Sequence, residues 1–304
     1  MRKPKVWPVL AVLWLALGAG CRASSAPATP PGPAPAGVAT TQPAGDLSAT
    51  STAAPTPTVI APTTASGQLP LIALDPGHGG EDLGARHFNL QHEMDIHEST
   101  IVLDLAHRVG DKLKAHGYRV FYTHDTDVLP NPGYAIDLNG DGEPSPLDDL
   151  LMRNKLINES GADLLLSLHL NAWENRDEAL VRATGGTETY YCPDRPFGDD
   201  NLRFATLVHE NILAAIKGLG LQANDRNVRI DNNEPGDMGR HLVILGPQND
   251  IIKIATNMPG ALSEPMFITC DAEAAALQRP EVLDALADAY VKAIVTFFEE
   301  KGKP

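Results

Sequence analysis

The sequence predicts an α/β fold: a single domain with a mostly parallel, twisted sheet flanked by helices and a functional site at the carboxyl ends of the strands. Short apolar runs alternate with segments of helical periodicity, which is the pattern of strands connected by helices. The run at 162–172, "ADLLLSLHLNA", is almost continuously apolar, as expected for a central strand covered on both faces. The chain has 304 residues and is 43% hydrophobic and 21% charged, so it can build such a core.

The individual elements follow from residue spacing and from the turn residues at their ends. In the segment 99–117, apolar residues recur at helical spacing from Ile101 to Leu113, and Gly117 ends the helix. The segment 118–124 alternates before it reaches "DTD", which predicts a strand. By the same reasoning, we expect strands at 71–75 and 186–192, helices at 147–161, 201–220 and 280–302, and short apolar segments at 241–246 and 260–268.

Residues 1–21 have the features of a signal peptide. Three cations in "MRKPK" precede the apolar run "VWPVLAVLWLALGAG", which is too short and too rich in terminal glycine for a membrane span. Cys21 follows directly and resembles the lipidated cysteine of bacterial lipoproteins, although Gly18 stands where that signal usually has leucine. The alternative is simple cleavage and secretion. In both cases we expect an exported protein of the cell envelope, anchored to membrane lipid through Cys21 or secreted.

The segment 22–68 predicts a linker between this signal and a folded domain at 69–304. It consists mainly of Ala, Pro, Thr, Ser and Gly, with Asp46 and Arg22 as its only charged residues. Such a composition buries too little apolar surface to offset the entropy lost on folding. The net charge of -15 argues against nucleic acid as a partner, and we expect a monomer. Cys192 and Cys270 could form a disulfide in an oxidising compartment or remain as buried free thiols.

Two histidines lie where predicted core strands end. His78 stands in "LDPGHGG" after the first strand, and His169 follows the apolar run "LLLSL". The glycines around His78 could also form a simple turn that leaves the ring exposed. Carboxyl ends of parallel strands meet at one edge, and two imidazoles with one carboxylate would form a catalytic zinc site with a fourth position for water.

Glu98 is the best candidate for the carboxylate, because the start of a helix can aim it back toward the sheet. The competing ligands are nearby residues of the same segment, namely His92, Glu93, Asp95 and His97. Glu98 could instead be an acid favoured by the helix dipole. Glu264 lies within the apolar run "GALSEPMFI" and directly precedes Pro265. A carboxylate in such a run needs a partner or a function, either as a general base beside a metal-bound water or as the partner of an arginine or a loop cap.

Several blocks of the chain resemble the zinc-dependent N-acetylmuramoyl-L-alanine amidases of the bacterial cell wall. They are "LIALDPGHGGEDLGA", "HES", "YTHDTD", "RNKLINESGADLLLSLHLNA", "GGTETYY" and "MPGALSEPMFI", in the family's order over nearly all of residues 70–300. The resemblance implies Zn²⁺ bound by His78, Glu98 and His169, with Glu264 as the catalytic glutamate. Leu103 matches the family spacing from Glu98. The implied reaction is hydrolysis of the amide bond between N-acetylmuramic acid and L-alanine in peptidoglycan.

The chain departs from the family pattern at four places, and none of them removes a proposed ligand or the base. Ser99 replaces the usual lysine, His124 replaces the arginine of "TRDTD", the segment from 78 to 98 is longer than usual, and "SEP" is atypical. Asn171 is a candidate hydrogen-bond donor to substrate or to a ligand. The alternatives to an amidase are a catalytically silent wall-binding lipoprotein and a different zinc peptidase acting on wall peptides. The histidine-rich loop at 86–97 is a hypothetical gate over the site.

An insertion at 137–149, "DLNGDGEPSPLDD", predicts a calcium loop of the EF-hand type. Oxygen-bearing residues and Gly142 stand at the required loop positions, and a helix follows. Ca²⁺ would have a structural role there. The alternative is an acidic, solvated turn whose Asp148 caps the helix. The predicted calcium ligands are Asp137, Asn139, Asp141, Glu143 and Asp148.

Overall fold

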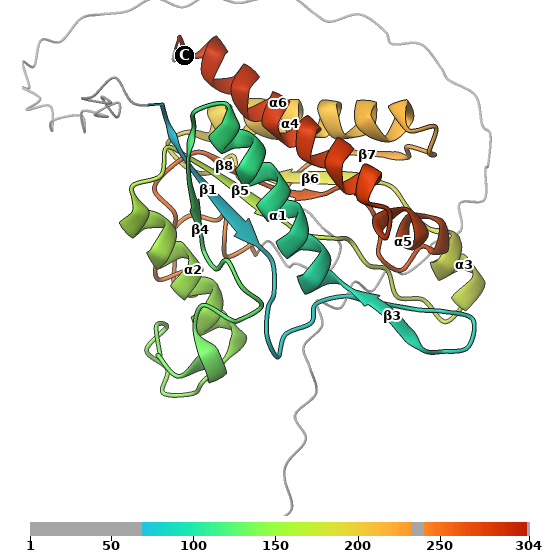
Figure 1. Cartoon of the computed structure of the whole chain (residues 1–304). Helices are drawn as coiled ribbons and strands as arrows, with labels where there is room; N and C mark the ends of the chain where they lie inside the picture. Colours follow the sequence, from blue (N-terminus) through green and yellow to red (C-terminus); the bar gives the residue numbers. More distant parts are fainter. Residues whose placement is uncertain (1–68, 233–239, 303–304) are drawn as a thin grey trace, which may run out of the picture. The chain divides into compact units, whose positions relative to one another are not determined.

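The computed structural model describes residues 69–232 and 240–302, which form a six-stranded sheet with helices on both faces (Figure 1). The strand order is β4-β1-β5-β8-β6-β7. The strands are β1 Leu71–Pro76, β4 Arg119–Tyr122, β5 Leu164–Leu168, β6 Thr187–Tyr191, β7 Asp225–Ile230 and β8 Gly260–Glu264. The helices are α1 Glu98–Ala115, α2 Pro146–Ser160, α3 Glu178–Ala183, α4 Gly198–Gly218, α5 Asp271–Leu277 and α6 Pro280–Glu300, with a short 3₁₀ turn at Pro132–Tyr134.

Strand direction divides this sheet into two parts. β4, β1, β5 and β8 are mutually parallel, which confirms the mostly parallel sheet. β6 runs antiparallel to β8, and β7 is parallel to β6. The carboxyl ends of β1, β5 and β8 therefore lie at one edge of the sheet, while those of β6 and β7 lie at the opposite edge.

The side chains of the central strands enter two different cores. Ile72 and Leu74 of β1 pack with α1, α4 and α6, whereas Ala73 between them packs with Ile157 of α2 and Leu245. Every residue of β5 is buried. This agrees with the continuous apolar run of the sequence, because a strand covered on both faces needs apolar residues at odd and even positions.

Several short elements were not predicted from the sequence. The expected loop at 86–97 contains an antiparallel hairpin of β2, Arg86–Phe88, and β3, Met94–His97. β7, α3 and α5 are also additional, and each is short or rich in polar residues. The predicted signal peptide, the linker and Cys21 lie outside the described residues. Among the helices of the described part, none combines the length and apolar character needed to cross a membrane.

Candidate metal centre and active site

Two glycines create the space in which the predicted ligands meet. A Cβ at Gly77 would lie 2.3 Å from Cε1 of the His169 ring, so only glycine allows the β1 loop to pass this imidazole. A Cβ at Gly84 would lie 2.6 Å from Oε2 of Glu98 and 2.6 Å from Cδ2 of His78. His78 itself has a left-handed backbone with φ 65°, an unusual conformation for a non-glycine residue that aims its ring at Glu98.

Glu98 connects the two histidines. Its Oε2 lies 3.1 Å from Nε2 of His78, and its Oε1 lies 3.1 Å from Nδ1 of His169. The carboxylate also accepts hydrogen bonds from the backbone N–H groups of Ala85 and Leu170, both at 2.9 Å. One donor atom from each of His78, Glu98 and His169 therefore lies within 4.8 Å of the others, as a three-ligand metal site requires.

The charges of this cluster favour a bound cation. Burial would raise the pKa of Glu98, but the imidazoles of His78 and His169 hold it well below its ordinary value. Burial would lower the pKa of His78, yet Glu98 and Asp82 raise it to about 10. The carboxylate is thus buried as an anion, and the positive charge beside it can be supplied by an imidazolium or by a metal ion.

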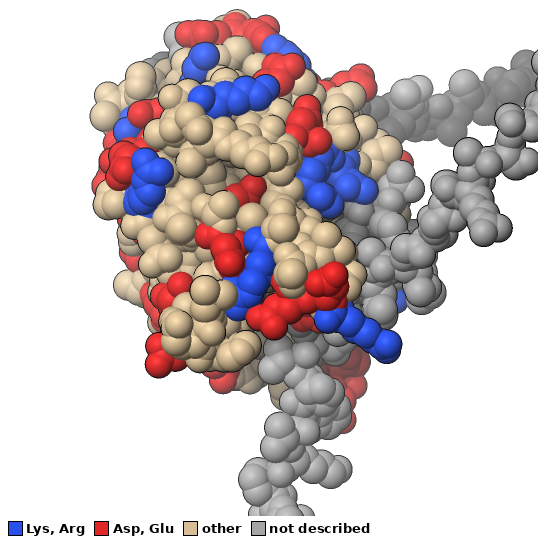
Figure 2. Space-filling model, turned by 90° about the vertical axis from the view of Figure 1, so that its right-hand side faces the viewer, with Lys and Arg blue, Asp and Glu red and all other residues tan. Residues whose placement is uncertain are grey.

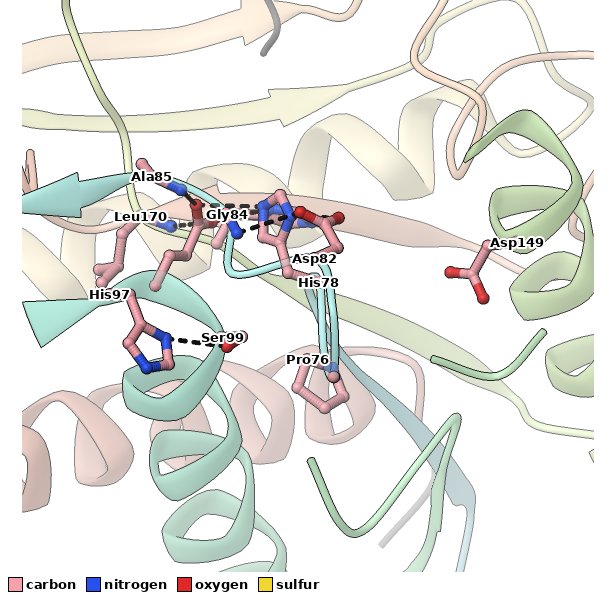
Figure 3. Close-up of polar contacts among 12 residues, drawn as sticks. Pro76, His78, Asp82, Gly84, Ala85, His97, Ser99, Asp149 and Leu170 are labelled. Atoms are coloured by element: carbon pink, nitrogen blue, oxygen red, sulfur yellow. Dashed lines mark hydrogen bonds and ion pairs between the residues drawn. The ribbon is translucent and has the colours of Figure 1, made fainter. Parts of the chain in front are cut away.

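Asp82 holds the other nitrogen of the His78 ring and was not identified from the sequence. Its Oδ2 lies 2.8 Å from Nδ1 of His78 (Figure 3). A carboxylate on the outer nitrogen fixes the ring so that Nε2 faces the metal position, a common arrangement around metal-binding histidines. The sequence signal was an acid four residues after the histidine in the same glycine-rich loop.

The competing ligands of the hairpin contact other groups. Nδ1 of His97 lies 3.1 Å from Oγ of Ser99, and Asp95 lies 2.7 Å from Nδ1 of His87. Glu93 and His92 are exposed at the hairpin turn. Among the described residues, the group at this edge that could hold a metal ion therefore consists of His78, Glu98 and His169. None of the four competitors belongs to it.

Glu264 is the last residue of β8, the strand next to the one that delivers His169. The backbone N–H of His169 donates to the carbonyl oxygen of Ser263 at 3.0 Å, so Glu264 follows directly on the residue paired with this ligand. Asn171 donates from Nδ2 to Oε2 of Glu188 at 2.8 Å and is buried. Glu188 stands opposite Glu264 in the β6–β8 pairing.

A buried arginine of α2 fixes the loop that carries His78, and sequence reasoning missed it. Arg153 donates from Nη1 to the carbonyl oxygen of Pro76 at 2.7 Å and from Nη2 to that of His78 at 2.6 Å. Its Nη1 lies 3.0 Å from Asp75, and its Nε lies 2.8 Å from Asp149. The two carboxylates compensate the buried guanidinium, and its planar donors determine the path of the loop.

His124, which replaces the family's arginine, is a neutral part of this environment. Burial first, and then the nearby Arg153 cation, lower the pKa of His124 to about 4. Its Nδ1 lies 3.3 Å from Oγ1 of Thr123, which also donates to Asp75. His124 therefore adds no permanent cation at this position, and the Arg153 guanidinium is the permanent cation that pairs with Asp75 at 3.0 Å.

The predicted calcium residues interact with the backbone of their own loop. Asp137 accepts from the N–H groups of Gly140 and Gly142, and Asp141 accepts from that of Glu143. Asp148 accepts from four donors and forms a capping box with Ser145 at the start of α2. These contacts correspond to the alternative interpretation of an acidic turn with Asp148 as a cap. Cys192 and Cys270 are both buried, free thiols.

Comparison with known proteins agrees with this architecture. A family model described as N-acetylmuramoyl-L-alanine amidase matches residues 72–296. The germination-specific N-acetylmuramoyl-L-alanine amidase of Bacillus subtilis (strain 168) is 31% identical over 238 residues, which cover 77% of this chain and 82% of that protein.

Solved structures share the fold. An N-acetylmuramoyl-L-alanine amidase from Clostridium difficile 630 has a TM-score of 0.55 and 24% identity, covering 78% of this chain and 100% of its own. The amidase AmiC2 of Nostoc punctiforme has a TM-score of 0.53 and 22% identity, covering 77% of this chain and 98% of its own. The family match spans most of the chain, and the cluster of His78, His169 and the buried Glu98 lies within it. The chain therefore belongs to the family of N-acetylmuramoyl-L-alanine amidases, which act on the peptidoglycan of the bacterial cell wall.

Proposed function

We propose that the enzyme is zinc-dependent and hydrolyses the amide bond between N-acetylmuramic acid and L-alanine in peptidoglycan. The observation that carries this proposal is the buried Glu98 carboxylate held between two imidazoles, because an imidazole–carboxylate–imidazole set is typical of catalytic zinc. His78, Glu98 and His169 would hold the ion. A zinc ion in this position would polarise the substrate carbonyl and lower the pKa of a water molecule.

Glu264 moves the proton in this proposal. Its position at the end of β8, directly after the residue bonded to His169, supports this role. The carboxylate takes the proton as the water attacks the amide carbonyl. It then returns the proton to the amine of the departing L-alanine, so one residue acts as general base and general acid.

The test compares the wild type with Glu264→Gln in the hydrolysis of purified peptidoglycan. The readout is the newly freed α-amino group of L-alanine, and the zinc content of each protein is measured in parallel. We expect the variant to keep its zinc and to lose about 10²- to 10⁴-fold in rate. Glu174→Gln, at an exposed loop position, is the matched control and should retain full activity.

Two results would count against the proposal. Release of a different amine from the same wall preparation would indicate a peptidase rather than a muramoyl amidase. Zinc-loaded wild type that binds wall without cleaving it would indicate a silent wall-binding protein. Loss of activity on chelation, restored by Zn²⁺, is the expected sign of the metal requirement.

We also propose that residues 1–21 export the protein, that Cys21 carries a lipid, and that 22–68 link it to the monomeric catalytic domain at 69–304. Support comes from the charge and hydropathy pattern of the sequence and from the wall enzymes to which the chain is similar. The calcium prediction for the 137–149 loop stays a prediction. The many backbone hydrogen bonds to Asp137, Asp141 and Asp148 favour the capping role.

A further inference from the structure

A second group of metal-binding side chains lies at the edge of the sheet opposite His78, Glu98 and His169. Cys192 follows the end of β6, Asp231 follows the end of β7, and His241 comes from the segment between β7 and β8. One ligand atom from each lies within 4.8 Å of the others. β6 and β7 are antiparallel to β1, β5 and β8. Their carboxyl ends, which carry this cluster, therefore lie at the opposite edge of the sheet.

The two distances from His241 suit three of the four ligand positions around a tetrahedral ion. Nδ1 of His241 lies 3.0 Å from Oδ1 of Asp231 and 3.5 Å from Sγ of Cys192. Ligands bound tetrahedrally to zinc at about 2.0–2.3 Å lie about 3.3–3.6 Å from one another, so small side-chain shifts would suffice.

One oxygen of the cluster lacks a hydrogen bond. Oδ2 of Asp231 is buried without a hydrogen-bond partner in the described part of the chain, and the Asp231 side chain is 0% exposed. The neighbouring Arg195 donates to the carbonyl oxygens of Thr256 and Met258 instead. An unsatisfied buried carboxylate oxygen is costly, and a cation would remove that cost.

The surroundings of His241 resemble those of metal-binding histidines. Its outer nitrogen, Nε2, lies 3.5 Å from Oδ2 of Asp194, a carboxylate oxygen that can accept from the ring N–H. A Cβ at Gly246 would lie 2.5 Å from Cβ of His241, so this glycine makes room for the base of the His241 side chain. Asp194 also lines a surface cavity of about 400 Å³.

We propose that Cys192, Asp231 and His241 bind a divalent transition-metal ion of the zinc type. Thiolate, imidazole and carboxylate together suit this class of ion rather than Ca²⁺ or Mg²⁺. The thiolate and the carboxylate neutralise its two positive charges, and the thiol proton leaves on binding. The ion joins β6, β7 and the 240–246 segment and has a structural role. Cys192 is 0% exposed, which excludes it as a nucleophile for large substrates.

Cobalt(II) distinguishes the two sites, because only the second site contains sulfur. The full chain is titrated with Co²⁺ while the near-ultraviolet sulfur-to-cobalt charge-transfer band is recorded. We expect two Co²⁺ ions per chain and one such band. Cys192→Ser should lose the band and one ion, whereas His78→Ala should lose one ion and keep the band. Cys270→Ser and Cys21→Ser are the matched cysteine controls. Each should keep both Co²⁺ ions and the charge-transfer band.

The absence of the band in the wild type, or its persistence in Cys192→Ser, would overturn the proposal. The first result would mean that the cluster is a hydrogen-bonded group without metal. Asp231→Asn preserves shape and thiol and serves as a second variant, with folding checked by circular dichroism. It should weaken Co²⁺ binding at the sulfur site at least tenfold without changing the other site. Equal binding by Asp231→Asn and wild type would also contradict the proposal. His78→Ala affects only the metal site of His78, Glu98 and His169. The experiment can therefore contradict metal binding at one site without contradicting it at the other.

Discussion

The side chains around Glu98 are packed so closely that single residues determine whether the site can form. Gly77 allows the His169 ring to lie against the backbone, and Gly84 leaves room for Glu98 and His78. The sequence showed the glycines and the histidines but could not show which glycine faces which ring. His78 and His169 are 91 residues apart in the chain, and their proximity depends on the pairing of β1 with β5.

Gly77→Ala should disrupt the metal centre more than the fold. The added methyl group would collide with the His169 ring and displace it, because the backbone on either side is held in β1 and by Arg153. We expect zinc affinity to fall at least tenfold and the rate to fall with it, measured by competition with a chelating dye. Gly218→Ala, at an open position of α4, should leave zinc affinity unchanged and could add up to about 1 kcal/mol of stability.

Arg153 should be sensitive even to a conservative change. Arg153→Lys keeps the charge but loses the planar set of donors that reaches Pro76, His78 and two carboxylates. We expect the free energy of unfolding to fall by about 2–4 kcal/mol, measured by urea denaturation. Lys155→Met removes an exposed cation of the same helix and should change stability by less than about 0.5 kcal/mol. A stable Arg153→Lys protein with unchanged kcat and KM would show that the guanidinium of Arg153 does not position the loop that carries His78.

At the scale of elements, apolar pattern predicted the parallel strands and long helices well. β1 and β5 are short and apolar, and the α1, α2, α4 and α6 helices begin and end within a few residues of their expected bounds. The hairpin β2–β3 was expected as a loop because its residues are largely polar. Its stability comes from distant partners: His87 lies 3.0 Å from Asp271, and Arg182 donates to the carbonyl oxygen of Phe88 at 2.9 Å. Local sequence contains no signal for such contacts.

Shortening the hairpin tests whether it gates the active site. Replacing residues 89–93 with Asn-Gly would retain the β2 and β3 strands and the Ala85 contact to Glu98. If the hairpin limits access, hydrolysis of peptidoglycan should rise severalfold while zinc content stays constant. Unchanged or reduced activity with intact zinc binding would exclude the gate. His87→Ala, which releases the hairpin from Asp271 without shortening it, should give a smaller increase.

At the scale of the whole molecule, the order and direction of the strands explain which distant residues lie together, which composition could not. Parallel β1, β5 and β8 bring His78, His169 and Glu264 to one edge, as expected for a sheet of this class. The reversal at β6 was not predictable from an apolar strand pattern, so the Cys192 cluster could not be assembled from the sequence. The side of the molecule that carries α3 and α5 shows basic and acidic residues interspersed (Figure 2). It presents no single basic surface, in agreement with the net charge of -15.

The contribution of Glu273 to global stability should decrease as pH rises from about 5 to about 8. Burial raises the pKa of Glu273 from 4.5 to about 7, so between these values the folded state binds more protons than the unfolded state. Its contribution is complete below pH 4.5 and is lost as the pH rises through about 7. The measurement is the free energy of unfolding in urea, as the difference between Glu273→Gln and the wild type. This difference should favour the variant by about 2 kcal/mol more at pH 8 than at pH 5. The exposed Glu210→Gln should give the same difference at both pH values.

The position of β1 has a mechanical consequence. The chain enters β1 at Leu71, on the edge opposite His78, and β1 is hydrogen-bonded to parallel strands on both sides, β4 and β5 (Figure 1). A force applied through the upstream chain, against a polymer held near His78, would pull β1 along its own axis. Its hydrogen bonds to both neighbours would then carry the load together instead of opening one after another. The strand through which tension enters is thus supported on both sides, and the His78 loop lies at its far end.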